Sequence, residues 1–177
     1  TVGCNNVKVT HDYIHIELVK ELLKNNVLVV ATGCSAHALA KAGFLNGEAT
    51  EKYAGDGLKA ILTAVGEAAG LGGPLPPVLH MGSCVDNSRI GDLVTALAKY
   101  LKVDTAALPV AASAPEPQHE KALSIGVWAV AMGITVHLGV VPPVLGSKPI
   151  TEMLTGGLTE VVGGKFYVEA DPVKAAA

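Results

Sequence analysis

The chain has 177 residues, enough for one domain with a substantial core, and half of the residues are apolar while only 4% are aromatic. A net charge of −3 without a basic patch argues against nucleic acid as a partner. Three widely separated cysteines argue against a secreted disulfide framework, and no targeting motif is found, so we expect a cytoplasmic protein.

Strands and helices alternate along the chain. Apolar or β-branched runs predict strands over residues 26–32, 77–81, 107–112, 134–138 and 166–169. Apolar residues at helical spacing predict helices over residues 11–25, 36–41, 56–69, 88–101, 117–132 and 150–154, and from 171 onward. Asn87 and Ser88 are expected to provide the N-cap of the helix over 88–101, and Glu116 is expected to favour the positive start of the helix over 117–132. Residues 44–55 are expected to be a polar connection. The alternation predicts a doubly wound parallel sheet in a Rossmann-like, three-layer αβα fold.

One apolar stretch, residues 122–146, is long enough to span a bilayer and almost uncharged. It contains His137, several glycines and the pair Pro142-Pro143. These residues divide the stretch into a buried helix that ends at Gly133 and a strand, so we expect no transmembrane segment.

Each cysteine lies on an expected loop that precedes a helix. Cys34 and Cys84 directly follow strands, and Cys4 precedes the helix over 11–25. Parallel sheets bind ligands at the carboxyl ends of their strands, and a helix N-terminus favours the thiolate form that binds metal. Buried structural cysteines would be expected within strands or helices. We therefore predict that the three thiols converge on one sheet edge as metal or cluster ligands.

Two further features leave alternatives open. His11 and His15 have a spacing that can bind zinc, but the glutamate of an HExxH motif is absent, so partly exposed histidines without a metal are expected. Lys121 lies near the start of a helix, where the dipole disfavours a cation. It is either a solvated surface lysine or a lysine directed at the edge that holds the cysteines.

Four motifs resemble the C-terminal domain of nickel–iron–sulfur carbon monoxide dehydrogenases. They are Gly3-Cys4-Asn5-Asn6, Ala31-Thr-Gly-Cys34-Ser-Ala, His80-Met-Gly-Ser-Cys84-Val-Asp-Asn-Ser-Arg-Ile and Pro115-Glu-Pro-Gln-His-Glu-Lys121-Ala. The motifs occur in the order found in that family, and the resemblance covers essentially the whole chain. The hybrid-cluster protein is a more distant relative that lacks the block around Cys84.

The resemblance implies a Ni–Fe–S cluster held partly by this chain. Cys4 and Cys34 would be thiolate ligands to iron, and Cys84 would be the thiolate on nickel. Lys121 would be the catalytic lysine that hydrogen-bonds the bound carboxylate, and Ile125 would be the apolar residue that crowds the CO site. The implied reaction converts CO and water into CO2, two protons and two electrons.

The resemblance also implies that parts of the active site lie elsewhere. The family's remaining cluster ligands, a histidine and two cysteines, and its electron-relay 4Fe-4S clusters belong to domains absent from this sequence; His80 and His119 are not expected to replace them. We expect residues 1–177 to be one cluster-binding domain, a C-terminal fragment of a homodimeric enzyme with a redox partner such as ferredoxin. The alternatives are a nickel-free Fe–S reductase resembling the hybrid-cluster protein, and a non-catalytic α/β domain with structural cysteines.

Overall fold

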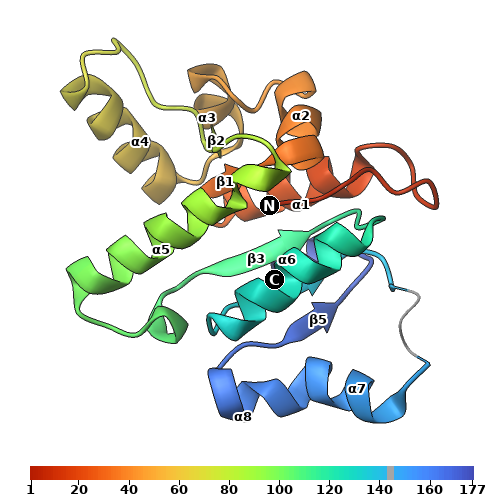
Figure 1. Cartoon of the computed structure of the whole chain (residues 1–177). Helices are drawn as coiled ribbons and strands as arrows, with labels where there is room; N and C mark the ends of the chain where they lie inside the picture. The colour runs from red at the N-terminus through yellow and green to blue at the C-terminus, as the bar shows by residue number, and fades with distance from the viewer. Residues whose placement is uncertain (143–145) are drawn as a thin grey trace.

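Figure 1 shows the fold as a computed structural model that describes residues 1–142 and 146–177. The strands are β1 (Val29–Ala31), β2 (Val78–His80), β3 (Ala111–Ala114), β4 (Thr135–Leu138) and β5 (Phe166–Val168). The helices are α1 (Tyr13–Lys24), α2 (Gly33–Lys41), α3 (Gly47–Tyr53), α4 (Asp56–Ala68), α5 (Asn87–Leu101), α6 (Glu120–Ala131), α7 (Lys148–Glu152), α8 (Leu158–Val162) and α9 (Pro172–Ala176). Short 3-10 turns form η1 (Cys84–Asp86) and η2 (Thr105–Ala107), and η3 (Met153–Gly157) is a π-helical turn.

The strands form two parallel ladders that the first residues of the chain join. β1 pairs with β2, and β4 pairs with both β3 and β5. The Thr1 nitrogen donates to the Val30 carbonyl (2.5 Å), and Thr32 N–H donates to the Thr1 carbonyl (3.0 Å). Val2 N–H donates to the Ser113 carbonyl (2.8 Å). Residues 1–2 therefore lie between β1 and β3, and the spatial order is β2, β1, residues 1–2, β3, β4, β5.

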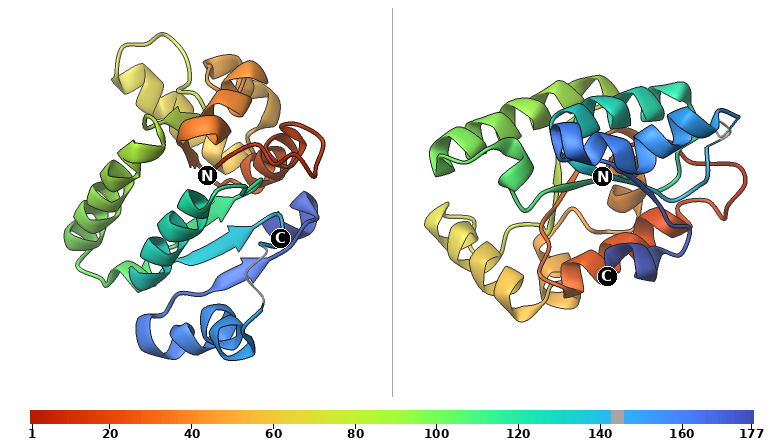
Figure 2. Two further views of the ribbon diagram at one scale, coloured as in Figure 1. Left: turned by 45° about the vertical axis from the view of Figure 1, so that its right-hand side comes forward. Right: turned by 90° about the horizontal axis from the view of Figure 1, so that it is seen from below.

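Helices cover both faces of these strands, which confirms the expected three-layer α/β fold. Viewed from below in Figure 2, α5, α6 and the α7–α8 segment lie on one side of the strands, and α1, α4 and α9 lie on the other. α1 also packs against α9. The expectation of one continuous sheet needs a correction, because the β1–β2 ladder reaches β3 only through residues 1–2.

Two apolar cores correspond to the two ladders. The first joins α1, α2, α3 and α4 to β1 and β2, and the second joins α5 and α6 to β3, β4 and β5. Aliphatic residues dominate both cores, in keeping with the low aromatic content, and Phe44 and Phe166 are the buried phenylalanines. The polar segments between the two cores can therefore form a functional site without interrupting either apolar core.

Several element boundaries differ from the expected ones for local reasons. Residues 44–55 contain α3, because the Asn46 side chain caps it by accepting from Ala49 N–H (3.0 Å). β3 begins at Ala111 instead of residue 107, since residues 105–107 form η2 and Pro109 has no N–H to donate. α6 begins at Glu120 instead of Pro117, because residues 115–117 pack against the first loop of the chain.

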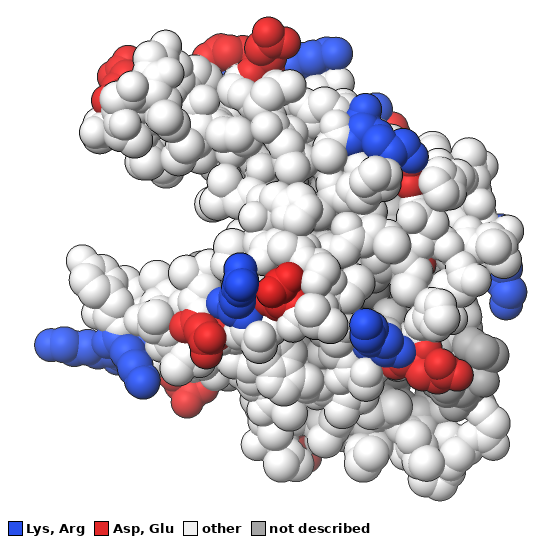
Figure 3. Space-filling view, turned by 45° about the horizontal axis from the view of Figure 1, so that its top comes forward, with Lys and Arg blue, Asp and Glu red and all other residues white. Residues whose placement is uncertain are grey.

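The apolar stretch 122–146 divides as expected. α6 ends at Ala131 and β4 begins at Thr135; Pro142 is described, whereas Pro143 lies outside the described residues. No helix in residues 1–142 or 146–177 is long and apolar enough to cross a membrane. The face in Figure 3 carries acidic and basic side chains in small mixed groups, with a hollow between two lobes at its left edge.

Candidate metal centre

All three cysteines lie at the carboxyl edge of the parallel strands. Cys34 is the second residue of α2, just after β1, and Cys84 begins η1, four residues after the end of β2. Cys4 follows residues 1–2, whose hydrogen bonds to Val30, Thr32 and Ser113 give that segment the direction of its neighbours. All three thiols are free. The sheet edge is the predicted one, but the loop placement needs a correction, because α2 begins at Gly33 instead of residue 36 and so contains Cys34, and Cys84 is the first residue of η1. The ligand roles themselves stay predictions.

A shared hollow brings two of the cysteines together with the lysine. It has a volume of about 370 Å³ and is lined by Gly33, Cys34, His37, Ser83, Cys84, Val85 and Lys121. Cys4 does not line this hollow. An adjoining hollow of about 310 Å³ shares Cys84 and Val85 with the first and adds Ile125, Ser124 and Trp128 from α6. Residues that the resemblance assigns to one site therefore come from α2, η1 and α6, which are distant in sequence.

The Cys84 sulfur packs directly on Gly33. Gly33 has φ of +58°, and a Cβ atom there would lie only 2.2 Å from Cys84 Sγ. Gly33 N–H also donates to the Gly82 carbonyl (3.0 Å), which ties the loop after β1 to the loop after β2. Glycine is needed at position 33 for two reasons, the left-handed backbone and the space for the sulfur. The position of the Cys84 thiol thus depends on the first residue of α2, the helix that carries Cys34.

The Cys84 loop has its own hydrogen-bonded support. Ser83 N–H and Oγ–H both donate to the Asp86 carboxylate (2.7 and 2.9 Å), which forms the helix cap that we had expected at Asn87 and Ser88. These hydrogen bonds, and then the charges of Arg89 and His80, lower the pKa of Asp86. Ser83 instead of Asn87 is therefore the residue that begins this helical segment.

Asn87 has a different role from the cap that we expected. Its Nδ2 donates to the Cys84 carbonyl (2.7 Å), while its Oδ1 accepts from the buried Thr32 hydroxyl (2.8 Å). Thr32 is the residue directly before α2, the helix that contains Cys34. This pair therefore connects the ends of β1 and η1 beneath the two cysteines.

The Cys4 loop is held by α1 and α2. The buried His15 donates from Nε2 to the Cys4 carbonyl (2.9 Å), since a carbonyl oxygen can only accept. Asp12 accepts from Asn5 Nδ2 and from Lys41 Nζ, both at 2.5 Å. Lys41 is the last residue of α2, so Asp12 ties the Cys4 loop to the helix that begins with Gly33 and Cys34. Asp12 itself adopts φ of +63°, which places it at the turn into α1.

The histidine prediction needs a correction. His11 is exposed as expected and lies 3.3 Å from the Asp12 carboxylate, but His15 is fully buried instead of partly exposed. Burial lowers the pKa of His15, although its hydrogen bond to Cys4 and the charge of Glu116 oppose that effect. The burial of His15 was not predicted, because helical spacing alone does not distinguish an exposed position on a helix from an ordinary core position.

The thiols influence one another electrostatically. Loss of hydration, followed by the neighbouring Cys84 and Cys4 thiols and the Asp12 charge, raises the pKa of Cys34. We had expected a helix N-terminus to lower it, and the backbone hydrogen bond does act in that direction, but it is the weakest contribution. Thiols that raise one another's pKa lose their protons more readily when a cation is close to them. The resulting thiolate is the form that binds metal.

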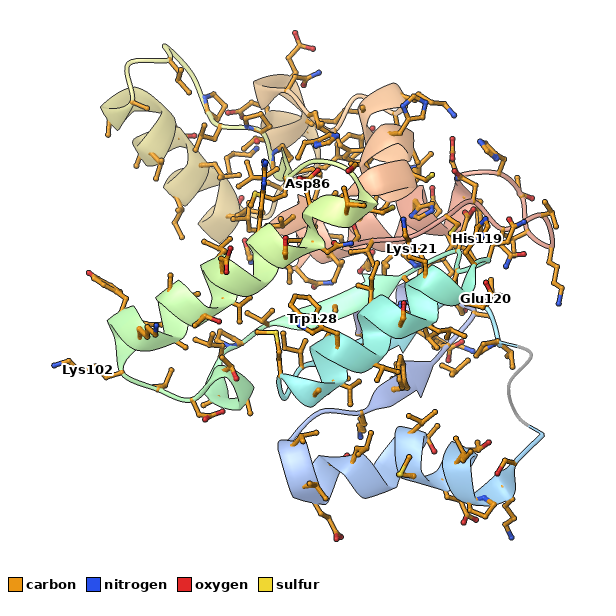
Figure 4. The ribbon with its side chains drawn as sticks, in the orientation of Figure 1. Asp86, Lys102, His119, Glu120, Lys121 and Trp128 are labelled. Carbon is orange, nitrogen blue, oxygen red and sulfur yellow. The ribbon has the colours of Figure 1, made fainter. Side chains whose placement is uncertain are left out.

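Lys121 lies beside two of the cysteines. Figure 4 shows it at the N-terminal end of α6, on the side where α2 and η1 begin. It lines the hollow with Cys34 and Cys84, and no ion pair within the described ranges involves it. Each alternative from the sequence agrees with part of this geometry, because the lysine is solvent-exposed and also borders the cysteine hollow. A catalytic role for Lys121 stays a prediction.

The donor set fits a multi-metal cluster better than a single ion. Across residues 1–142 and 146–177, no three His, Cys, Asp or Glu side chains are close enough to hold one metal ion. Ligands of an Fe–S cluster bind different metals and so do not need to meet at a point. This chain provides such separated ligands in part: two thiols line one hollow beside a close-packed glycine, and a third thiol lies at the same edge.

Comparison with known proteins identifies relatives across the whole chain. The Prismane/CO dehydrogenase family matches residues 1–173. Carbon monoxide dehydrogenase 2 of Carboxydothermus hydrogenoformans is 59% identical over 174 residues, which is 98% of this chain and 27% of that protein. Carbon monoxide dehydrogenase of Rhodospirillum rubrum is 58% identical with the same coverage. The chain thus spans about a quarter of the length of these relatives.

Solved structures agree with this result. Carbon monoxide dehydrogenase IV from Carboxydothermus hydrogenoformans superimposes with a TM-score of 0.95 at 73% identity, covering 99% of this chain and 28% of that one. A carbon monoxide dehydrogenase from Thermococcus sp. AM4, crystallised as isolated in a nickel-free form, gives 0.90 at 54% identity, covering 99% and 26%.

Proposed function

Because the chain belongs to the Prismane/CO dehydrogenase family, we propose that it is the cluster-binding C-terminal domain of an anaerobic carbon monoxide dehydrogenase. The intact enzyme would be an oxidoreductase that converts CO and water into CO2, two protons and two electrons. The observation that supports this most directly is the hollow in which Cys34, Cys84 and Lys121 meet, from three separate elements.

The three cysteines would hold part of a Ni–Fe–S cluster. Cys4 and Cys34 would bind irons and Cys84 nickel, because soft thiolates suit both metals. The cluster would supply the binding of CO and the redox chemistry. The hydrogen bonds to the carbonyls of Cys4 and Cys84, from His15 and Asn87, would keep these two thiols in place as the cluster is loaded.

Lys121 and Ile125 would act on the substrate. The Lys121 ammonium would donate a hydrogen bond to the oxygen on which negative charge develops, and would hold or release a proton there. Ile125 lies one helical turn further along α6 and lines the adjoining hollow beside Cys84. Its apolar side chain would narrow the space available to the ligand and keep water away from it.

The remaining ligands and the further 4Fe-4S clusters would belong to other domains of the same cytoplasmic enzyme. An exposed apolar residue supports such a covering at the cysteine edge: Val85, next to Cys84, is 74% exposed. We propose that this edge packs against those domains, that the enzyme is a homodimer, and that electrons leave to a carrier such as ferredoxin. A nickel-free reductase is disfavoured, because the relatives compared above are carbon monoxide dehydrogenases.

The test is to produce the full-length enzyme anaerobically with nickel and to measure CO oxidation with an artificial electron acceptor. We expect CO-dependent reduction together with bound nickel and iron. A full-length protein that is folded and contains iron but no nickel, and that does not oxidise CO after nickel is supplied, would overturn the proposal. A protein without metal would support structural cysteines instead.

A further inference from the structure

A buried polar pair adjoins the Cys4 loop, and neither of its members lines the hollow that holds Cys34 and Cys84. His15 of α1 and Glu116, in the segment before α6, are both 0% exposed. Glu116 Oε1 accepts from Ile14 N–H (3.1 Å), which satisfies one free donor at the start of α1. His15 Nε2 donates to the Cys4 carbonyl (2.9 Å). The pair therefore connects a predicted cluster ligand to the segment that leads into the Lys121 helix.

One atom of each side chain has no hydrogen-bond partner. These atoms are His15 Nδ1 and Glu116 Oε2, both almost inaccessible to solvent. Since Nε2 carries the proton that is donated to Cys4, Nδ1 of a neutral ring is an acceptor. The second oxygen of the Glu116 carboxylate is also an acceptor. Two buried acceptors without donors are each unfavourable by about 1–3 kcal/mol, so a donor is expected between them.

The two side chains do not satisfy each other directly. No hydrogen bond or ion pair within the described part of the chain joins them, yet Glu116 accepts from the N–H of Ile14, the residue next to His15 in α1. A side chain from another domain is an unsuitable donor, because neither atom reaches the surface. A buried water molecule can donate one hydrogen to each of two acceptors.

We propose that His15 and Glu116 are positioning residues for Cys4 that share one buried water, donating to His15 Nδ1 and Glu116 Oε2. The water and the two side chains would connect Cys4 to the start of α6. The relative position of the Cys4 thiol and Lys121 would then depend on hydrogen bonds that touch neither the cluster nor the substrate. The water site rests on the burial of these two unpartnered acceptors, whereas its effect on the cluster rests on the proposed function.

The first test is a crystal structure of the full-length enzyme at a resolution that shows ordered water. We expect density within roughly 2.6–3.2 Å of both atoms. A pocket that is dry, or that has closed so that the two side chains contact each other, would overturn the water site. This result does not depend on whether the enzyme oxidises CO, so it distinguishes failure of this inference from failure of the proposed function.

The second test uses two His15 variants of the full-length enzyme. His15→Gln places an amide nitrogen where Nε2 lies and keeps a donor for the Cys4 carbonyl, whereas His15→Asn imitates Nδ1 and removes that donor. We expect His15→Asn to lower cluster iron and kcat about tenfold and to change the EPR spectrum of the reduced cluster, and His15→Gln to restore most of both.

Glu116→Gln tests the other half of the pair. It keeps the acceptor for Ile14 N–H, and its amide can satisfy the water, so we expect metal content within about twofold of wild type, with Glu116→Ala about tenfold lower. Glu160→Gln, on the exposed surface of α8, is the matched control. Equal EPR spectra and metal content in His15→Asn, His15→Gln and the control would overturn the positioning role.

Discussion

The close packing of Gly33 against Cys84 leads to a sharp prediction for Gly33→Ala. The added Cβ would lie 2.2 Å from Cys84 Sγ, and real Cβ contacts essentially never come under 3.0 Å, so one group must retreat by about 0.8 Å. The left-handed φ of +58° adds roughly 1–2 kcal/mol for any side chain. A misplacement near 1 Å at a reacting centre lowers rates about a hundredfold.

We therefore expect Gly33→Ala in the full-length enzyme to lower CO oxidation by about ten- to a hundredfold and to reduce nickel content more than iron content. The assay is steady-state CO oxidation with metal analysis of the same samples. Gly43→Ala is the matched control, because Gly43 also has a positive φ (+82°), but a Cβ added there would meet no atom within 4 Å. It carries the backbone strain without the collision.

The comparison separates strain from displacement of the sulfur. If Gly33→Ala and Gly43→Ala have the same activity and the same nickel-to-iron ratio, then the Cys84 sulfur tolerates the intrusion and its position is not important for function. Such a result would refute the reasoning, even if both variants were less stable than the wild type.

Three further predictions concern the full-length enzyme. Cys84→Ala should remove nickel and CO oxidation together while most of the iron stays, as metal analysis would show; equal loss of both metals would contradict a role confined to nickel. Lys121→Ala should lower turnover by about a hundred- to a thousandfold at full metal content, and Lys121→Arg should restore only part, because a planar fork replaces a compact ammonium; near-normal turnover would return Lys121 to a surface role. Burial alone would raise the pKa of Asp12, but the hydrogen bond from Lys41, the charges of His11 and Lys41 and the hydrogen bond from Asn5 lower it. The ionised Asp12 carboxylate therefore stabilises the fold above about pH 4, and this contribution is lost as the pH falls through the lowered pKa. Asp12→Asn should thus reduce the thermal midpoint more at pH 7 than at pH 3, and an equal reduction at both would contradict the ionic role.

The order of strands and helices could be predicted because apolar periodicity decides it locally. Cys34 and Cys84 were placed at the correct edge since each lies shortly after a predicted strand. The role of residues 1–2 could not be predicted: their position between β1 and β3 depends on backbone hydrogen bonds to residues 30, 32 and 113, which no local pattern encodes.

The supports of the site were the part that the sequence did not reveal. Asn87 was expected to cap a helix, because asparagine is favoured there, but Ser83 and Asp86 form the cap and leave the Asn87 amide free to bind Cys84 and Thr32. Glu116 was expected to favour a helix start, yet it is buried against α1. Both roles depend on segments that meet only in the folded chain. The sequence did contain one signal for Glu116: it lies between Pro115 and Pro117, a position that disfavours a helix.

The central claim is that Cys4, Cys34 and Cys84 bind one Ni–Fe–S cluster. Anomalous diffraction from crystals of the full-length enzyme, measured on both sides of the nickel and iron absorption edges, tests it most directly. We expect iron peaks at thiolate bonding distance, about 2.3 Å, from the sulfurs of Cys4 and Cys34, and a nickel peak at that distance from Cys84. In metal-loaded enzyme that oxidises CO, anomalous peaks that lie beyond bonding distance of these three sulfurs would contradict the account.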